Sequence, residues 1–240
     1  MVTAYKHFDA IKEIDGWFYK EDALVFEAID SAQANHHFNG DLLEIGAYHG
    51  KSAAFLGFLL RPGEHLYVCD LFQTTATSAA NKLENNHWYP SLGRETFERN
   101  YLLIHQHLPK VLACRSSRLK RTGNLTRTFR FIHIDGSHLY QIVKQDLRTS
   151  SDLLKKGGVV AIDDYRSPHT PGVAAATWEA VLSGRLMPIC ITPQKMYATF
   201  RERNGPLYRT LRNWCQEQNE LQIAVDRVYG KQILRLSGKT

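Results

Sequence analysis

The stretch Leu42-Leu43-Glu44-Ile45-Gly46-Ala47-Tyr48-His49-Gly50-Lys51-Ser52 decides the fold of this 240-residue chain. It begins as an apolar run typical of a strand, enters a glycine turn and continues into an alanine-rich segment typical of a helix. A strand that ends in such a turn places a helix N-terminus at the carboxyl edge of a parallel sheet, where open α/β proteins bind ligands. The stretch therefore predicts an α/β protein with a nucleotide-type pocket at that edge.

Spacing separates three kinds of glycine loop. A dinucleotide fingerprint needs G-x-G-x-x-G, but Tyr48 stands where the second glycine belongs. A phosphate-binding P-loop needs four residues before Gly-Lys-Ser, and Gly46 to Gly50 leaves only three, with the Glu44 carboxylate at the entrance. An acid followed by Gly-x-x-x-Gly suits a cofactor with an ammonium and a sulfonium group, because a carboxylate pairs with ammonium and repels phosphate. The pattern Glu44-x-Gly46-x-x-x-Gly50-x-Ser52 resembles the first motif of class I S-adenosylmethionine-dependent methyltransferases. The alternative is an ordinary tight turn between a strand and a helix.

A second acid follows the next strand. The run His65-Leu66-Tyr67-Val68-Cys69-Asp70 ends in a carboxylate, about 20 residues past the glycine turn, which is the distance at which an acid reaches ribose hydroxyls in a βαβ unit. Asp70 is therefore the predicted ribose ligand. A helix N-cap is the alternative role for an Asp at the end of a strand.

Two further strands also end in acids. Residues 129–134 lead into Asp135, and residues 157–162 lead into Asp163 and Asp164. If these strands are adjacent and parallel, the three carboxylates converge beside the glycine loop, where they repel unless a cation neutralises them. Oxygen ligands favour a hard divalent ion, Mg²⁺ before Ca²⁺ or Mn²⁺. The alternative is that each acid caps a helix.

These residues also carry a resemblance to a known family. The core Ile134-Asp135-Gly136-Ser137-His138-x-Tyr140, followed by Asp146, Leu154, Gly157-Gly158 and Asp163-Asp164-Tyr165, resembles the metal-assisted class I O-methyltransferases. The resemblance is strongest to the group that methylates sugar hydroxyls in macrolide, aminocoumarin and mycobacterial polysaccharide biosynthesis, and Ile14-Asp15-Gly16-Trp17 agrees with it. It implies a Rossmann-like fold, with a mostly parallel seven-stranded sheet, helices on both faces and an N-terminal helical cover.

The resemblance also implies roles for individual residues. In the related catechol-type enzymes a Lys acts as base three positions after the strand-end Asp, where this chain has His138. A neutral imidazole suits proton abstraction near pH 7, so the predicted catalytic residues are His138, as the base, and Asp135. The predicted cofactor ligands are Glu44, Gly46, Ala47, Tyr48, Gly50, Ser52, Asp70, Leu71, Ser116 and Asp135, and the predicted Mg²⁺ ligands are Asp135, Asp163 and Asp164.

Composition fits an enzyme of the cytoplasm. We expect no membrane partner, because the first residues lack the apolar core of a secretory signal and no membrane-length apolar run is present. The four cysteines lack CxxC spacing and indicate free thiols. A net charge of +6 invites a nucleic-acid interpretation, but the basic residues are scattered. The one small cluster is interpreted as solvated surface, and comprises Arg115, Arg118, Lys120, Arg121, Arg127 and Arg130.

The remaining segments are predicted to surround one methyltransferase domain over residues 1–240. Residues 8–38 have apolar positions at helical spacing and predict two helices in a cover over residues 1–38. The long polar segment 71–101 is interpreted as a substrate lid. Further predictions are a third strand at Val111–Cys114, a helix after Pro171, a strand pair at 187–192 and 195–201 closing an antiparallel edge, a helix at 207–218, and a hairpin or fraying tail at 221–236.

The predicted reaction is methyl transfer from S-adenosylmethionine to a sugar hydroxyl of a small-molecule or oligosaccharide acceptor. Three alternatives remain open: a methyltransferase for catechol-like aromatics, an RNA-directed methyltransferase, and a binding or scaffold protein with a vestigial pocket. Nucleic acid is the less favoured partner. The sequence leaves a homodimer open.

Overall fold

The computed structural model describes residues 2–72, 79–88, 93–122, 125–201, 205–217 and 221–238. Within these ranges the strands form one nine-stranded sheet in the order β3-β2-β1-β4-β5-β7-β6-β9-β8. The strands are β1 (Asp41–Ile45), β2 (Leu66–Asp70), β3 (Lys110–Ala113), β4 (Phe129–Ile134), β5 (Leu154–Ile162), β6 (Leu186–Ile191), β7 (Met196–Phe200), β8 (Leu221–Val228) and β9 (Lys231–Gly238).

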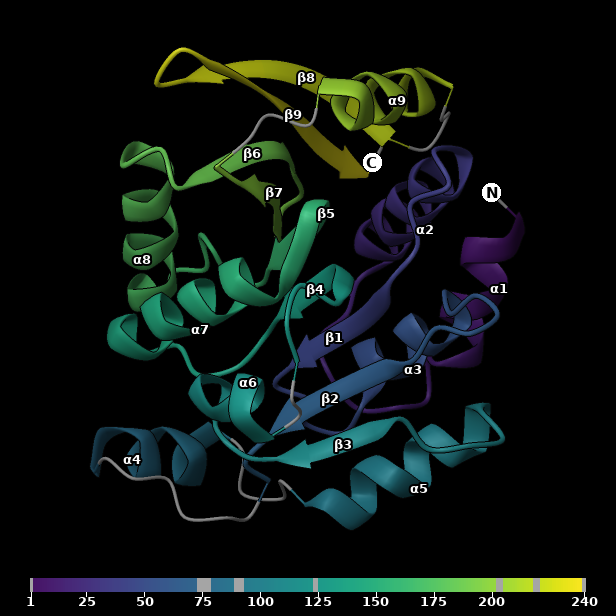
Figure 1. Ribbon diagram of the computed structural model, residues 1–240, viewed down its shortest axis with the longest axis vertical. Helices are drawn as coiled ribbons and strands as arrows, with labels where there is room; N and C mark the ends of the chain where they lie inside the picture. Colours follow the sequence, from purple (N-terminus) through teal and green to yellow (C-terminus); the bar gives the residue numbers. More distant parts are fainter. Residues whose placement is uncertain are drawn as a thin grey trace.

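Helices cover both faces of the sheet (Figure 1). One face packs against α2, α3 and α5, and the other against α7 and α8. The described helices are α1 (Val2–Ala10), α2 (Lys20–Asn35), α3 (Lys51–Phe58), α4 (Ala79–Trp88), α5 (Arg94–Ile104), the short η1 (Ser116–Arg118), α6 (Leu119–Thr122), α7 (Tyr140–Leu153), α8 (Pro171–Leu182) and α9 (Gly205–Gln216).

The central strands are parallel, as their sequences predict. β1 pairs with β2 and β4, and β4 pairs with β5, all in parallel register. All six residues of β4 are buried, because helices on both faces leave no polar side to a central parallel strand. The carboxyl ends of β1, β4 and β5 therefore reach the same edge, which confirms the arrangement expected from the sequence.

The prediction of seven strands is too low for this chain. Residues 221–236 were expected as a hairpin or a fraying tail, and they form the antiparallel hairpin of β8 and β9, whose turn is Tyr229-Gly230. Both turn residues have positive φ (49° and 73°), the conformation of the tight turns that match strand twist. β9 adds to β6 in parallel, and β7 lies between β5 and β6. The pair β6–β7 is thus antiparallel, as predicted, but does not close the sheet.

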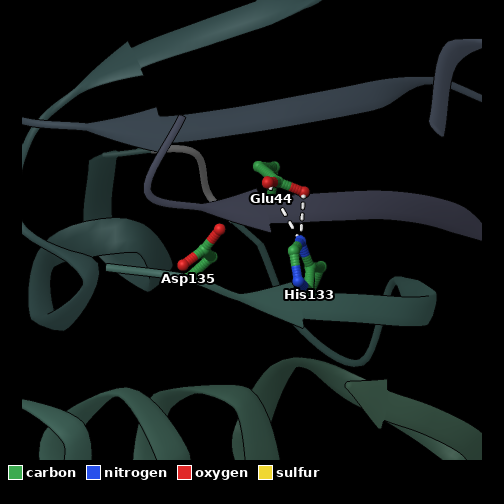
Figure 2. A group of neighbouring side chains, drawn as sticks. All are labelled: Glu44, His133 and Asp135. Carbon is green, nitrogen blue, oxygen red and sulfur yellow. Dashed lines mark hydrogen bonds and ion pairs between the residues drawn. The ribbon is translucent and has the colours of Figure 1, made fainter. Parts of the chain in front are cut away.

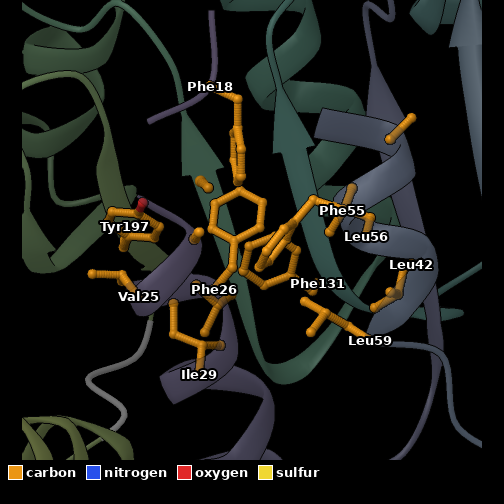
Figure 3. Packing of buried hydrophobic residues seen from close by; sticks show 14 of the residues in the cluster. Phe18, Val25, Phe26, Ile29, Leu42, Phe55, Leu56, Leu59, Phe131 and Tyr197 are labelled. Carbon is orange, nitrogen blue, oxygen red and sulfur yellow. The ribbon is translucent and has the colours of Figure 1, made fainter. Parts of the chain in front are cut away.

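The N-terminal cover contains two helices with different bounds from those predicted. Residues 11–19 are turns and extended chain rather than helix, and they still bury Ile11, Ile14 and Phe18 against the core. Figure 3 shows Phe18 beside Phe26 of α2, which in turn approaches Phe131 and Tyr197 of the sheet. Apolar spacing mimics a helix here because each side chain enters the same core from irregular backbone.

Two other segments differ from their predictions. The segment 71–101 was interpreted as one long loop, but α4 and the start of α5 lie within it; residues 73–78 and 89–92 of the segment lie outside the described residues. Arg130 was assigned to the basic surface cluster, but its side chain is 1% exposed. It donates hydrogen bonds to Glu64, Gln33 and the Leu59 carbonyl. Its charge is therefore paired inside the fold and does not belong to the basic surface.

No described helix combines the length and the apolar character that a membrane crossing requires.

Candidate active site

Three strand ends meet at the carboxyl edge of the sheet. The Asp135 amide, just after β4, donates to the Ile45 carbonyl of β1 at 2.8 Å, and the Asp163 amide, just after β5, donates to the Ile134 carbonyl at 2.9 Å. The glycine loop, Asp135 and Asp163 therefore follow one another across three adjacent strands. This is the crevice where open α/β sheets bind their ligands.

Two glycines shape the loop between β1 and α3. Gly46 has φ +87°, and a Cβ built there would lie 2.0 Å from the Asp135 carbonyl oxygen. Gly50 has φ +91°, and its Cβ would meet the Phe97 ring at 2.8 Å. Both positions combine a left-handed backbone with a close neighbour, so only glycine fits. The loop consequently lies directly against the chain that carries Asp135.

Asp70 fastens the second strand to the same loop. Its Oδ2 accepts a hydrogen bond from the Ala47 amide at 2.6 Å, and its Oδ1 accepts one from the Phe72 amide at 2.6 Å. Burial raises the pKa of the Asp70 carboxyl, and the backbone donors act against that rise. Each carboxylate oxygen has a second lone pair, so the predicted ribose contact is compatible with these bonds.

Glu44 is placed differently from a group that faces a ligand. Its side chain is fully buried, Oε1 accepts a hydrogen bond from Ser52 Oγ at 2.6 Å, and both carboxylate oxygens lie 3.0 Å from His133 Nδ1. Figure 2 shows the His133 ring directed at Glu44 from the neighbouring strand. The side chains of Glu44 and Ser52 are hydrogen-bonded to each other. Their predicted contacts with the cofactor therefore remain predictions.

His138 is held between two carboxylates. Its Nε2 lies 3.2 Å from Asp164 Oδ2, and its Nδ1 lies 3.7 Å from Glu84 Oε1 of α4. Glu84 also accepts hydrogen bonds from the His138 amide and from Ser137 Oγ, each at 2.6 Å. Burial alone would lower the pKa of His138, but the hydrogen bond and charge of Asp164, helped by Glu84, outweigh it and raise that pKa. His138 is therefore a stronger base than a free imidazole.

The pKa values of Asp135 and Asp164, two acids near His138, are shifted in opposite directions. Burial, together with the charge of Asp163, raises the pKa of Asp135 well above its usual range. Burial would also raise the pKa of Asp164, but hydrogen bonds from His138 and from Ser167 Oγ, the latter at 2.5 Å, bring it below the usual range. Asp164 is thus the ionised partner of His138.

Lys195 supplies a cation that the sequence analysis missed. It follows the turn between β6 and β7, its side chain is fully buried, and its ammonium donates to Asp163 Oδ2. Burial would lower its pKa, but the charges of Asp163, Asp22 and Asp135 raise the pKa of Lys195 instead. The residue is therefore an ammonium ion in the interior.

The predicted Mg²⁺ ligands do not fit that ion as they are arranged. Asp163 bonds to Lys195 through Oδ2 and to the Asp164 amide through Oδ1, and Asp164 is engaged by His138. Two unit charges 4 Å apart interact by roughly 4 kcal/mol at an effective dielectric of about 20, and a divalent ion doubles the repulsion from a neighbouring ammonium. In the part of the chain that the structure describes, the three aspartates do not form a group with ligand-like spacing.

A different group has such spacing. Glu44, His133 and Asp135 offer ligand atoms within 4.8 Å of one another, and Figure 2 shows their side chains on the adjoining strands β1 and β4 and just beyond. Glu44 and His133 are both fully buried and bonded to each other. The other ring nitrogen, His133 Nε2, is buried without a hydrogen-bond partner among the described residues, and it lies 3.9 Å from Asp163 Oδ2. The group therefore keeps one unsatisfied ligand atom, whereas the Glu44 oxygens and His133 Nδ1 are engaged with each other.

Aromatic residues from the N-terminal segment line the rim. The Trp17 ring stacks on Tyr48 at 5.5 Å, and Tyr48 stacks on His49 at 3.9 Å. Trp17 remains 59% exposed, which leaves apolar surface at the mouth. Burial and the charges of Asp163 and Asp164 raise the pKa of the Tyr19 hydroxyl, which places Tyr19 near the same acids. The segment before α2 therefore forms one wall of the site.

Ser116 and Leu71 complete the predicted cofactor residues. Ser116 follows β3 and its hydroxyl donates to Asp146 of α7. Burial raises the pKa of Asp146 to about 7. Leu71 directly follows Asp70 and is partly exposed. Both lie in segments that leave the carboxyl ends of β2 and β3, and their contacts with a cofactor remain predictions.

Comparison with known proteins agrees with this geometry. A family model described as a methyltransferase domain matches residues 43–165, which is just over half of the chain. This chain belongs to that methyltransferase family. Membership confirms the predicted class of enzyme, and it agrees with a loop that suits S-adenosylmethionine. No curated protein matches the chain significantly in sequence.

Solved structures share the fold at low sequence identity. The O-methyltransferase NovP is 20% identical, with a TM-score of 0.58 over 75% of this chain and 80% of its own. A Corynebacterium glutamicum protein is 11% identical, with a TM-score of 0.50 over 85% of this chain and 92% of its own. CalS11, a TDP-rhamnose 3′-O-methyltransferase of calicheamicin biosynthesis, is 14% identical, with a TM-score of 0.46 over 84% of this chain and 94% of its own. The similarities to NovP and to the Corynebacterium glutamicum protein show a common fold and leave the acceptor open.

Three site residues escaped the sequence analysis, and two of them, His133 and Lys195, left a signal in the sequence. His133 alternates with Phe129 and Phe131 in a strand, and this spacing of two directs it into the core, where an imidazole needs a partner. Lys195 is a lone cation between two apolar strand runs. Glu84 lies in the segment interpreted as a loop, and only the presence of α4 brings it to His138.

Proposed function

We propose that this methyltransferase transfers the methyl group of S-adenosylmethionine to a hydroxyl of a sugar-containing small molecule or oligosaccharide, with His138 as the general base. The observation that carries the proposal is the His138–Asp164 pair, 3.2 Å apart, one loop away from Asp135 and the glycine turn. A hydroxyl must lose its proton as it attacks the methyl group. A base with a raised pKa at the cofactor edge suits that task.

Asp164 is proposed to keep the imidazole in place and to stabilise the imidazolium that forms. The contact from His138 Nε2 fixes the orientation of the ring, and the ionised carboxylate favours the protonated product. The hydrogen bond to Asp164 sets the tautomer of the neutral ring. S-adenosylmethionine supplies an activated methyl group when bound, so the protein mainly positions the two reacting groups.

The sequence also predicts assistance by Mg²⁺. Its predicted ligands Asp163 and Asp164 are engaged by Lys195 and His138, so the proposal includes no step through a metal ion. NovP, which shares the fold, is an O-methyltransferase. The fold is therefore compatible with O-methylation, although a shared fold alone does not assign that reaction to this chain.

The decisive test replaces His138 by alanine. We expect turnover to fall by roughly 10²–10⁴-fold, the usual share of a positioned base, while calorimetry shows unchanged binding of S-adenosylhomocysteine. His65→Ala is the matched control, because His65 precedes β2 at the opposite edge of the sheet and is 52% exposed. Equal turnover in His138→Ala and the control would refute the assignment of the base.

The acceptor is tested separately with a panel of hexosides, catechols and RNA. Methylation of hexosides alone supports the proposal. Preference for catechol would mean that the same residues act on an aromatic substrate. Binding of an RNA acceptor would weaken steeply as the salt concentration rises. Failure to bind S-adenosylhomocysteine would support the alternative of a binding or scaffold protein with a vestigial pocket.

A further inference from the structure

The acidic strand ends need a counter-charge, and Lys195 already provides one. Asp163 and Asp164 follow β5, and Asp135 follows β4 at the next position across the sheet. The ammonium of Lys195 bonds to Asp163 Oδ2 and has no exposure to solvent. A buried carboxylate is stable only when it is paired and hydrogen-bonded. This pairing satisfies that condition within the chain itself.

Lys195 is held in position by a dedicated set of contacts. Its amide donates to Thr192 Oγ1 at 2.9 Å, and its carbonyl accepts from the Thr192 amide at 2.9 Å, which closes the turn between β6 and β7. Thr192 Oγ1 and the Tyr197 hydroxyl both donate to Asp22 Oδ1 of α2, at 2.6 and 2.7 Å. The turn is thus fixed to the helix that covers the sheet, which holds the backbone of Lys195 beside Asp163.

Apolar side chains close the space around this ion pair. The ammonium lies 5.6 Å from the centre of the Phe18 ring. Phe18 packs against Phe26, whose ring approaches Tyr197 in the core layer shown in Figure 3. A water-excluding shell strengthens the interaction between the ammonium and its carboxylates.

The pair also acts on the proposed base through a chain of contacts. With Oδ2 bound by Lys195, Asp163 accepts the Asp164 amide on Oδ1 at 2.8 Å. That bond orients the backbone of Asp164, whose side chain holds His138. Lys195 is therefore a positioning residue: it touches no reacting atom, but it determines where Asp164 and His138 lie.

We infer that the Lys195 ammonium is the resident cation of this acidic site and that methyl transfer by this chain proceeds without a divalent ion. The inference rests on the proposed methyl transfer for its catalytic part only. Its electrostatic part, that the carboxylates are compensated from within, stands on the contacts of Lys195 with Asp163 and of His138 with Asp164.

The wild-type protein gives the first test. We expect unchanged turnover after treatment with a chelator, and no heat of Mg²⁺ or Mn²⁺ binding in calorimetric titrations. Loss of turnover on chelation with recovery by Mg²⁺ would overturn the inference. So would uptake of Mn²⁺ that Asp163→Asn abolishes. The titration needs no acceptor, so it decides the inference even if the proposed acceptor is wrong.

Substitution of Lys195 gives the second test. Lys195→Met removes the charge and keeps the apolar stem, so we expect turnover to fall on the order of 10²-fold, as for a displaced catalytic group. The affinity for S-adenosylhomocysteine should not change, and the uncompensated carboxylates should now take up Mn²⁺. Lys195→Arg keeps the charge and should recover part of the turnover in chelator. Lys110→Met, on the exposed β3 edge, is the control.

The outcomes separate a positioning role from a merely structural one. If Lys195→Met folds, binds no Mn²⁺ and turns over as wild type does, the inference is wrong. If it does not fold, the wild-type titration and the Lys195→Arg variant decide: metal-free turnover in both supports the inference, and a requirement for Mg²⁺ in the wild type refutes it.

Discussion

Replacing Gly46 by alanine should damage the site and the fold together, and the chain contains a glycine that separates the two causes. The Cβ of an alanine at this position would lie 2.0 Å from the Asp135 carbonyl oxygen, and the residue would have to keep φ +87°. The atom it meets is backbone on the neighbouring strand end, so no side-chain rotation relieves the overlap. Either the glycine loop or the chain at Asp135 must move by about an ångström, as a normal carbon–oxygen contact requires.

The magnitude follows from two contributions. A left-handed backbone costs a non-glycine residue roughly 1–2 kcal/mol, and forcing extra volume into a packed site costs roughly 1–3 kcal/mol. The sum is about 3 kcal/mol, which lowers the melting temperature of a domain of this size by roughly 6–12 °C. Gly63 is the matched control: its φ is +83°, and a Cβ there would have no neighbour within 4 Å. Gly63→Ala should therefore show only the backbone contribution.

Urea unfolding and calorimetry with S-adenosylhomocysteine measure the two effects. Gly46→Ala should lose about 2 kcal/mol more stability than Gly63→Ala, the share assigned to overlap, and should also lose cofactor affinity. Gly63→Ala should bind the cofactor product as wild type does. Equal stability and equal affinity in the two variants would refute the close approach of the glycine loop to Asp135.

Four further outcomes test other parts of the site. Asp70→Ala should weaken S-adenosylmethionine binding by roughly 1–3 kcal/mol, the cost of an unpaired buried donor; wild-type affinity would move the ribose elsewhere. Burial raises the pKa of Asp146 to about 7, so the folded state binds an extra proton between the unfolded and folded pKa values. Stability should therefore fall as pH rises from about 4 to 7, by up to roughly 4 kcal/mol, and unfolding curves of Asp146→Asn should lack that fall. The pKa of His138 is raised, so turnover should rise with pH along a limb above pH 6.5, the free imidazole value. Asp164→Asn should move that limb to lower pH. A limb that does not move would show that Asp164 does not set the pKa of the catalytic base. Proteolysis within residues 71–101 should slow when S-adenosylhomocysteine binds, and equal cleavage with and without it would remove the lid hypothesis.

The strand ends of the site could be predicted from sequence because they depend on local patterns. A buried strand followed by an acid marks the edge of a parallel sheet, and Gly46, Asp70, Asp135 and Asp163 all lie where that rule places them. The family could be predicted for the same reason, since its motifs are short and lie on these strand ends.

The counter-charge of the acids could not be predicted in this way. Lys195 reaches Asp163 only because β7 inserts antiparallel between β5 and β6, and no local pattern fixes that insertion. The sequence argument proposed Mg²⁺ as the cation, which stays a prediction, and it did not consider Lys195, because the spacing of acids says nothing about a lysine further along the chain. The prediction for Arg130 failed for the converse reason: the other basic residues of its cluster are exposed, whereas Arg130 lies in a buried strand and its partners come from α2 and from the segment before β2.

The β8–β9 hairpin has a consequence for the order in which the protein can fold during synthesis. Helix α2 carries Asp22, to which the Lys195 turn is fixed, and α2 packs against α9 and β9. A glycine at the end of β9, Gly238, lies so close to α2 that a Cβ there would be 2.6 Å from Glu21 Oε1. The helix made among the first elements thus receives its last neighbours from residues 205–238, which leave the ribosome long after it. Until then one side of α2 stays open to water, and a nascent chain stalled before residue 205 exposes apolar surface that a chaperone would recognise.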